Sequence, residues 1–208
     1  MAQFFSVHID NPQKRLIRQA AAIIRNGGVI VYPTDSCYAL GCHIGDKDAV
    51  RRICEIRQVD EKHHFTLVCR DLSEISHYAR VDNRQYRLLK AATPGSYTFI
   101  LRASREVPKR LQHPKRKTIG LRIPDHAVVR ELLEEMNEPL LSCTLLLPGD
   151  EMPLNDAVEI RSRLEHRVNL VLDGGSCGVE MTTVVDLTEE VPLLLRKGKG
   201  NLAIFGLH

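Results

Sequence analysis

The sequence predicts an α/β fold, in which short apolar strands alternate with amphipathic helices. Residues 29–31 form a β-branched run that follows two glycines and stops at Pro33, which is typical of a buried strand. Residues 46–57 then carry apolar side chains at helical spacing. Because strand and helix patterns keep alternating, we expect helices packed on a sheet. Further strands are expected at 65–69, 97–101, 119–124, 139–147, 168–172, 182–186 and 192–196, and further helices at 72–78, 82–92, 126–136 and 156–165.

The first helix is expected at residues 11–26, packed on the sheet. Asn11 suits the N-cap position and Pro12 the first helical position. Gly27 is expected to end the helix, because glycine readily adopts the left-handed conformation found at helix ends. No internal repeat and no low-complexity linker divides the 208 residues, so we expect a single domain over residues 1–208.

The composition indicates a globular protein of ordinary charge. Hydrophobic residues make up 43% of the chain and charged residues 26%, while the formal net charge of +3 does not by itself indicate nucleic acid. Residues 1–10 lack the apolar core of a signal peptide, and no apolar run is long enough to span a membrane. We therefore expect a cytoplasmic protein whose six cysteines are buried, reduced thiols. Cys37, Cys42 and His43 match no common zinc pattern, so no structural metal is expected.

A polar turn of Thr34, Asp35 and Ser36 follows the strand at 29–31. A strand that ends in hydroxyl groups ahead of a helix is a common place for a ligand in α/β proteins. The same residues also suit a tight turn in which Asp35 and Ser36 cap the local backbone. Both interpretations remain open on the sequence.

The segment 102–122 is strongly basic, with eight lysines and arginines against one acidic residue. Its prolines, Pro108 and Pro114, are expected to keep much of it out of helix. Such a loop can follow the phosphate backbone of a nucleic acid, although it can equally be a solvated surface loop. If the segment binds RNA, the residues expected to do so are Arg105, Lys109, Arg110, Lys115, Arg116 and Lys117.

Two of the predicted strands carry polar side chains among apolar ones. Arg122 lies between Leu121 and Ile123, so its side chain is expected on the opposite face of the strand. Ser142 and Thr144 are two residues apart and are expected to share one face. Two such hydroxyl groups suit a carboxylate or a phosphate, but they are also often polar atoms bonded within the protein.

Five stretches together resemble the YrdC-like family, which includes the threonylcarbamoyl-AMP synthases. The resemblance is strongest to the YciO branch of that family, and the order and spacing of the motifs hold over nearly the whole chain. The stretches are YPTDSCYALG at 32–41, PGSYT at 94–98, GLRIPDH at 120–126, TTVVD at 182–186 and LRKG at 195–198.

The resemblance implies a three-layer α/β fold, with a twisted mixed β-sheet flanked by helices and a large concave basic cavity. The synthases of the family join L-threonine, bicarbonate and ATP into threonylcarbamoyl-AMP and release pyrophosphate, and Mg²⁺ is expected with the ATP. Other proteins then pass the threonylcarbamoyl group to adenosine 37 of tRNA. Members of the family are also described as binding double-stranded RNA or tRNA.

The resemblance also assigns roles to individual residues of this chain. Positioning and neutralisation of phosphate charge are the effects expected of them, as in other adenylyl transfers. The catalytic residues would be Arg57, Arg122, Ser142 and Thr144, the substrate-binding residues Thr34, His63, Arg122 and Thr182, and the nucleotide-binding residues Arg57, Thr118, Thr144 and Arg196.

Two departures from the motifs of the synthases weaken that expectation. Where the synthases carry Lys-x-Arg, this chain has Arg57 and Val59, and where they carry Ser-x-Asn, it has Thr144 and Leu146. Loss of a cation and of an amide donor would each cost on the order of 10²-fold in rate. A neighbouring cation, such as Lys62 or Lys199, could take over part of the role.

Three functions therefore remain open on the sequence. The first is a weak synthase. The second is a non-catalytic protein that binds double-stranded RNA or tRNA. The third is a regulatory protein whose cavity holds another nucleotide. The sequence gives neither the oligomeric state nor any partner protein.

Overall fold

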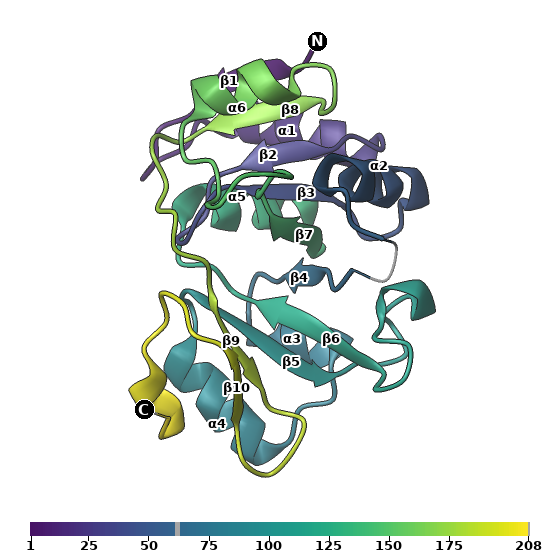
Figure 1. Ribbon diagram of the computed structural model, residues 1–208, viewed down its shortest axis with the longest axis vertical. Coiled ribbons are helices and arrows are strands. Elements are labelled where there is room, and N and C mark those ends of the chain that lie inside the picture. The colour runs from purple at the N-terminus through teal and green to yellow at the C-terminus, as the bar shows by residue number, and fades with distance from the viewer. Residues whose placement is uncertain (61–62, 208) are drawn as a thin grey trace.

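The computed structural model describes residues 1–60 and 63–207, and within these ranges ten strands form one sheet (Figure 1). The strand order is β1-β8-β2-β3-β7-β4-β6-β5-β9-β10. Parallel and antiparallel pairs are mixed, since β4 runs parallel to β6 and antiparallel to β7. The predicted mixed α/β architecture is therefore confirmed. The strands are β1 (Gln3–Ser6), β2 (Ile30–Tyr32), β3 (Ala39–His43), β4 (Thr66–Val68), β5 (Tyr97–Arg102), β6 (Thr118–Arg122), β7 (Leu140–Thr144), β8 (Leu170–Asp173), β9 (Thr183–Asp186) and β10 (Leu193–Arg196).

Helices lie on both faces of this sheet. The helices are α1 (Lys14–Arg25), α2 (Lys47–Arg57), α3 (Leu72–Tyr78), α4 (Asn83–Ala92), α5 (Ala127–Met136) and α6 (Ala157–Leu164), with short 3-10 helices η1 (Lys109–Leu111) and η2 (Leu202–Phe205). Alternate side chains of β2 point to opposite faces of the sheet. Ile30 and Tyr32 accordingly pack in one apolar cluster with α1 and α5, while Val31 packs in another with α2. The sheet is thus the middle of three layers.

The helices α2, α4 and α6 begin one residue after the start of their predicted ranges, whereas the first helix begins later than predicted. The side chains of Asp46, Asp82 and Asp156 each accept a hydrogen bond from a backbone N–H three residues further on. The expected start at Asn11 is wrong, because α1 begins at Lys14 with Gln13 in the N-cap position.

The delayed start of α1 has a local cause. His8 Nδ1 accepts hydrogen bonds from the backbone N–H groups of Asp10 and Asn11, at 3.3 and 3.2 Å. The Gln13 side chain in turn accepts from the backbone N–H of His8. These bonds hold residues 8–13 in a turn that competes with the helix.

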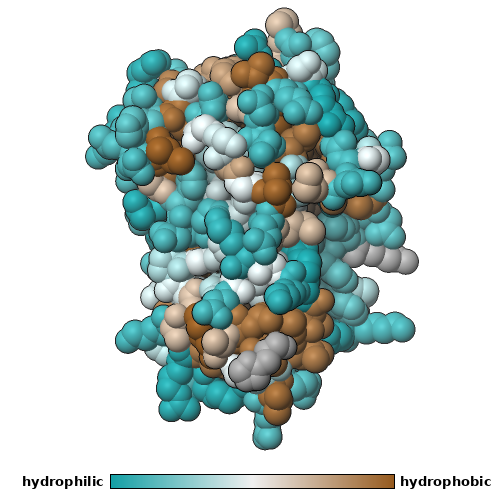
Figure 2. Space-filling view, turned by 60° about the vertical axis from the view of Figure 1, so that its left-hand side comes forward, coloured by the Kyte–Doolittle hydropathy of each residue, from teal (hydrophilic) through white to brown (hydrophobic). Residues whose placement is uncertain are grey.

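The basic segment lies outside regular helix, as its prolines predicted, apart from the single turn of η1. His113 organises its tip, because Nδ1 of His113 accepts from the backbone N–H groups of Lys115 and Arg116. Figure 2 shows a largely hydrophilic face of the molecule, on which hydrophobic side chains gather towards the lower end. Within residues 1–60 and 63–207, no helix has both the length and the apolar character needed to cross a membrane.

Candidate functional site

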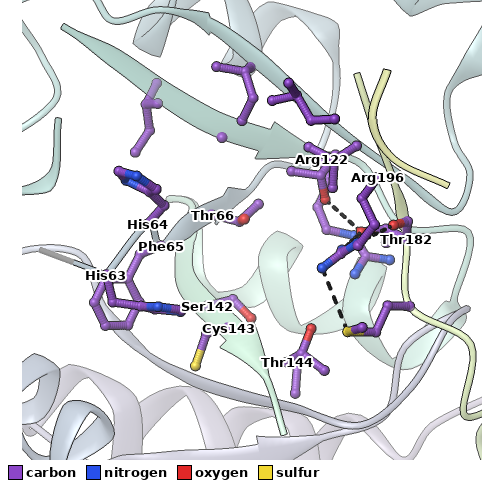
Figure 3. Close-up of a pocket in the computed structure, with 18 of the residues that line it drawn as sticks. His63, His64, Phe65, Thr66, Arg122, Ser142, Cys143, Thr144, Thr182 and Arg196 are labelled. Carbon is purple, nitrogen blue, oxygen red and sulfur yellow. Dashed lines mark hydrogen bonds between the residues drawn. The ribbon is translucent and has the colours of Figure 1, made fainter. Parts of the chain in front are cut away.

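A cavity of about 380 Å³ opens against the middle strands of the sheet, and its wall is rich in cations and hydroxyl groups (Figure 3). Among its described lining residues there is no aspartate or glutamate. A concave surface of one charge sign concentrates ligands of the opposite charge. The cavity therefore suits an anion. Its charged, imidazole and hydroxyl residues are Arg57, Arg116, Arg122, Arg196, His63, His64, His113, Thr66, Thr98, Thr118, Ser142, Thr144 and Thr182.

All but one of the residues assigned to substrate or nucleotide lie in this wall. The exception is Thr34, which is buried and does not line the cavity. Its hydroxyl group donates to the carbonyl oxygen of Cys37 at 2.7 Å and accepts from the backbone N–H groups of Ser36 and Cys37. Thr34 therefore stabilises the turn and does not reach the cavity. From this turn it is Cys37 that lines the wall.

Arg122 ends β6 and is only 8% exposed. One of its terminal nitrogens, Nη2, forms an ion pair with the carboxylate of Asp35. The other, Nη1, lies 3.5 Å from the hydroxyl oxygen of Ser36, and Nε has no hydrogen-bond partner. Arg122 is thus a held guanidinium with donor capacity left for a ligand.

Arg196 stands beside Arg122 in the wall and is held differently (Figure 3). Its Nε donates to the carbonyl oxygen of Thr182 and its Nη2 to the hydroxyl of Thr182, both at 3.0 Å. That hydroxyl also bonds the hydroxyl of Thr98 at 2.9 Å. No carboxylate of the described residues pairs with Arg196, and burial together with the charge of Arg122 lowers the pKa of Arg196. A ligand anion would relieve this accumulation of positive charge.

Ser142 lies in the wall, but its proton is already engaged. Its hydroxyl donates to the carbonyl oxygen of Leu40 at 3.0 Å, so the Tyr32 hydroxyl, 2.6 Å away, must donate to Ser142. Burial raises the pKa of Tyr32, which keeps Tyr32 protonated. Ser142 can therefore accept a hydrogen bond from a ligand but has no free proton to give, which limits the catalytic role expected of it.

Arg57 braces the chain at the end of β7. Its Nη1 donates to the carbonyl oxygens of Thr144 and Leu146, at 2.8 and 2.6 Å. Of the two departures from the motifs of the synthases, Leu146 contributes a backbone carbonyl oxygen to this contact, whereas Val59 packs against the apolar core. Lys62, one of the proposed substitutes, lies outside the described residues. The other, Lys199, contacts the backbone carbonyl of Asp35 and does not line the cavity.

Three titratable side chains of the wall, His63, Cys37 and Cys143, have pKa values shifted in favour of the uncharged form. Burial, and then the charge of Arg57, lower the pKa of His63, whose ring packs edge-on against Phe65 with centroids 5.4 Å apart. Burial raises the pKa of the Cys143 thiol to about 12 and also raises the pKa of Cys37. Neither thiol is activated as a nucleophile.

The six residues proposed for RNA do not form one surface. Arg116 turns inward, where its Nη2 lies 2.6 Å from the carboxylate of Asp186, and it lines the cavity. Arg105 points away, with a side chain that is 95% exposed beside Glu106. Lys109, Arg110 and Lys117 border a second hollow of about 250 Å³, while Lys115 is exposed.

Sequence reasoning missed two hydroxyl residues of the wall, Thr66 and Thr98, and it did not foresee the contact of Asp35 with Arg122 behind the wall. Thr66 is paired with Ser142 across β4 and β7, and Thr98 of β5 bonds Thr182, which directly precedes β9. Each threonine is a hydroxyl residue within an apolar strand, which is the signal that identified Ser142 and Thr144. That signal becomes specific only when the strand order brings these hydroxyl groups together.

Residues 22–198 match the Sua5/yciO/yrdC family, whose description reads Telomere recombination. The chain belongs to this family. It is 56% identical over 205 residues to the protein YciO of Escherichia coli K12, covering 99% of this chain and all of that protein. The crystal structure of E. coli YciO superposes with a TM-score of 0.95, over 99% of this chain and 100% of that one.

Relatives that are named as enzymes are more distant. The threonylcarbamoyl-AMP synthase of Homo sapiens is 31% identical over 179 residues, which is 83% of this chain and 63% of that protein. The crystal structure of Pyrococcus abyssi Sua5 complexed with L-threonine is 27% identical, with a TM-score of 0.85 over 94% of this chain and 57% of that one. The chain thus spans little more than half of that longer protein.

Proposed function

We propose that this chain is a threonylcarbamoyl-AMP synthase of low activity, which joins L-threonine, bicarbonate and ATP and releases pyrophosphate. The observation that carries the proposal is the cavity wall, in which arginines and hydroxyl groups converge. The described residues that line this cavity include no aspartate or glutamate. L-Threonine contributes a carboxylate, and bicarbonate and ATP are anions, so all three suit such a wall. The family's distant members include synthases, and a Sua5 structure of the same fold is described as complexed with L-threonine.

The proposed roles follow from which groups are held and which have donors left. Arg122 and Thr182 bind the carboxylate of L-threonine, and the loosely held Nη1 of Arg122 offers it a donor. Arg196 and Thr118 contact the phosphates, and Thr144 lies between the two ligands. These groups act by positioning the reactants and by neutralising the charge that develops as pyrophosphate leaves.

Magnesium enters the proposal only as part of Mg–ATP. Mg²⁺ in nucleotide sites is usually held by one or two carboxylates together with the phosphates. The described lining residues offer hydroxyl groups but no carboxylate, and the described chain holds no group of three or more residues suited to a metal ion. The phosphates of the nucleotide would therefore supply the ion's main ligands.

The low activity follows from the bracing role of Arg57. Its Nη1 is taken up by two backbone carbonyl oxygens, and Val59 and Leu146 add no donor to the wall. Fewer fixed donors at the leaving phosphates mean less stabilisation of the transition state.

The test is an assay with radiolabelled L-threonine, ATP, Mg²⁺ and bicarbonate, in which threonylcarbamoyl-AMP and pyrophosphate are both measured. We expect product that requires all three substrates and disappears in Arg122→Ala, with circular dichroism used to check that the variant is folded. If wild type yields no more product than Arg122→Ala, the synthase proposal is wrong.

A second candidate function is binding of double-stranded RNA or tRNA, with or without synthase activity. It is favoured by the exposed Lys109, Lys115 and Lys117, of which the first and last border the smaller hollow beside the cavity. If the chain is a synthase, other proteins would transfer the threonylcarbamoyl group of its product to adenosine 37 of tRNA. The proposed compartment for either function is the cytoplasm, where reducing conditions maintain thiols.

A further inference from the structure

The carboxylate of Asp35 joins three separate segments of the chain. Asp35 lies in the turn between β2 and β3, and its side chain is 9% exposed. Its Oδ1 pairs with Nη2 of Arg122, while Oδ2 accepts from the Ser96 hydroxyl and from the backbone N–H of Asp125, both at 3.1 Å. The donors thus come from β6, from the turn ahead of β5 and from the turn ahead of α5. A buried carboxylate held this way has little freedom to move.

Asp35 is therefore placed to act on Arg122 rather than on a ligand. Its two carboxylate oxygens already accept from three donors, and Asp35 does not line the cavity, whereas Arg122 does. Arg122 has little else to hold it, because its contact with Ser36 is 3.5 Å long and its Nε is unpartnered. A buried donor without a partner gains most when a ligand oxygen reaches it.

We propose that Asp35 is a positioning residue, which holds Nη2 of the Arg122 guanidinium so that Nη1 can bind a ligand carboxylate in the cavity. The identity of that ligand, L-threonine, rests on the proposed function. The ion pair also offsets the repulsion between Arg122 and the neighbouring Arg196, which otherwise favours movement of one guanidinium away from the other. Without Asp35, Arg122 keeps its charge but loses its fixed direction.

A double-mutant cycle separates positioning through Arg122 from a general structural effect. Calorimetric titration with L-threonine is carried out on wild type, Asp35→Asn, Arg122→Ala and the double variant. We expect Asp35→Asn to weaken L-threonine binding by about tenfold or more and Mg–ATP binding by less than about twofold. Adding Asp35→Asn to Arg122→Ala should cause little further loss. Asp125→Asn is the matched control, because Asp125 lies three residues after Arg122, its side chain is exposed, and only its backbone N–H bonds Asp35.

A second readout needs no ligand. The Nε–H of Arg122 gives its own nitrogen–proton NMR signal, and its exchange with water reports how firmly the guanidinium is held. We expect that exchange to be about tenfold faster or more in Asp35→Asn, and unchanged in Asp125→Asn. Ser96→Ala, which removes one donor to Asp35 but no charge, should give a smaller change in the same direction and serves if Asp35→Asn does not fold.

The outcomes distinguish the two proposals. If wild type does not bind L-threonine, the proposed function fails, and the exchange of the Arg122 signal still decides the role of Asp35. Equal exchange in wild type, Asp35→Asn and Ser96→Ala overturns the positioning role. Losses of L-threonine affinity that multiply in the double variant overturn it as well, because Asp35 then acts independently of Arg122.

Discussion

The cavity wall and residues 102–117, the part of the basic segment before β6, are both cationic, but they hold their cations in different ways. Arg122 and Arg196 are fixed by an ion pair or by hydrogen bonds to Thr182. The side chain of Arg105 is 95% exposed, and Lys109 and Lys117 stand at the surface. Fixed charges stabilise a transition state without reorganising, whereas mobile surface charges mainly attract and steer. The wall therefore suits chemistry on a small anion, and the segment suits at most a contact with a large one.

The largest effect among the following predictions is expected at Arg196, a cation of the wall that has no carboxylate partner among the described residues. Arg196→Ala should lower synthase kcat/KM by about 10²-fold, because it removes the charged donor that we propose binds the phosphates. The matched control is Arg105→Ala, which removes an arginine of equal charge from the segment and should change kcat/KM by less than about twofold. Equal losses in the two variants would show that overall charge, and not the wall, determines activity.

The next effect concerns the segment alone. If RNA binds there, changing Lys109, Lys115 and Lys117 together to alanine should reduce the slope of log affinity against log salt concentration by about three. Synthase activity should stay within about twofold of wild type, because none of the three lysines lines the cavity. Filter binding of double-stranded RNA at several salt concentrations measures the slope, and an unchanged slope excludes the segment as the RNA contact.

The fold could be predicted where a strand has a clear pattern of its own, and not where only pairing with its neighbours defines the strand. Strands with β-branched or apolar runs, such as β2 and β6, were found to within a few residues. β3 was missed because the sequence Ala-Leu-Gly-Cys-His has no β-branched residue, and its pairing with β2 and β7 is what makes it a strand. β1 is a four-residue edge strand set by its pairing with β8.

The candidate site was predictable by residue type but not by contact. The polar residues noted on apolar strands, Arg122, Ser142 and Thr144, line the cavity, and so do Arg57, His63, Thr118, Thr182 and Arg196, which the family resemblance supplied. Asp35 and Thr34 stand side by side in one motif, yet Thr34 closes its own turn while Asp35 reaches across to Arg122. Arg57 bonds backbone carbonyls that are more than eighty residues away in sequence. Such partners depend on strand order, which periodicity does not reveal.

Arg116 belongs to the basic segment, but like the arginines of the wall it is held by a fixed partner, the carboxylate of Asp186. The dependence of protein stability on pH can test this ion pair. Burial tends to raise the pKa of Asp186, but hydrogen bonds from Thr188 and Arg116 outweigh it and lower that pKa below the usual range. A carboxyl whose pKa is lower when folded adds stability above its unfolded pKa of about 3.9, and loses it as pH falls through the folded value.

Asp186→Asn should therefore lower the free energy of unfolding by about 1–3 kcal/mol at pH 7, with a smaller difference from wild type below about pH 4. Urea unfolding between pH 3 and pH 7, a range chosen to bracket the usual carboxyl pKa, measures it. The control is Asp48→Asn, whose side chain is 81% exposed and pairs with Arg51 at the surface. A constant difference across the pH range would mean that the charge of Asp186 contributes nothing.

The smallest expected effect tests the hydrogen bonds behind the wall. Tyr32→Phe removes the donor to Ser142 but leaves the bond from Ser142 to the carbonyl oxygen of Leu40, so it should cost about 1 kcal/mol of unfolding free energy. Tyr86→Phe, at a tyrosine that is 43% exposed on α4, should cost less than about 0.5 kcal/mol. If Ser142 matters to the ligand only as an acceptor, Tyr32→Phe leaves the affinity for L-threonine unchanged or slightly higher. A marked loss of that affinity in calorimetry would instead mean that Tyr32 fixes the position of Ser142 in the wall.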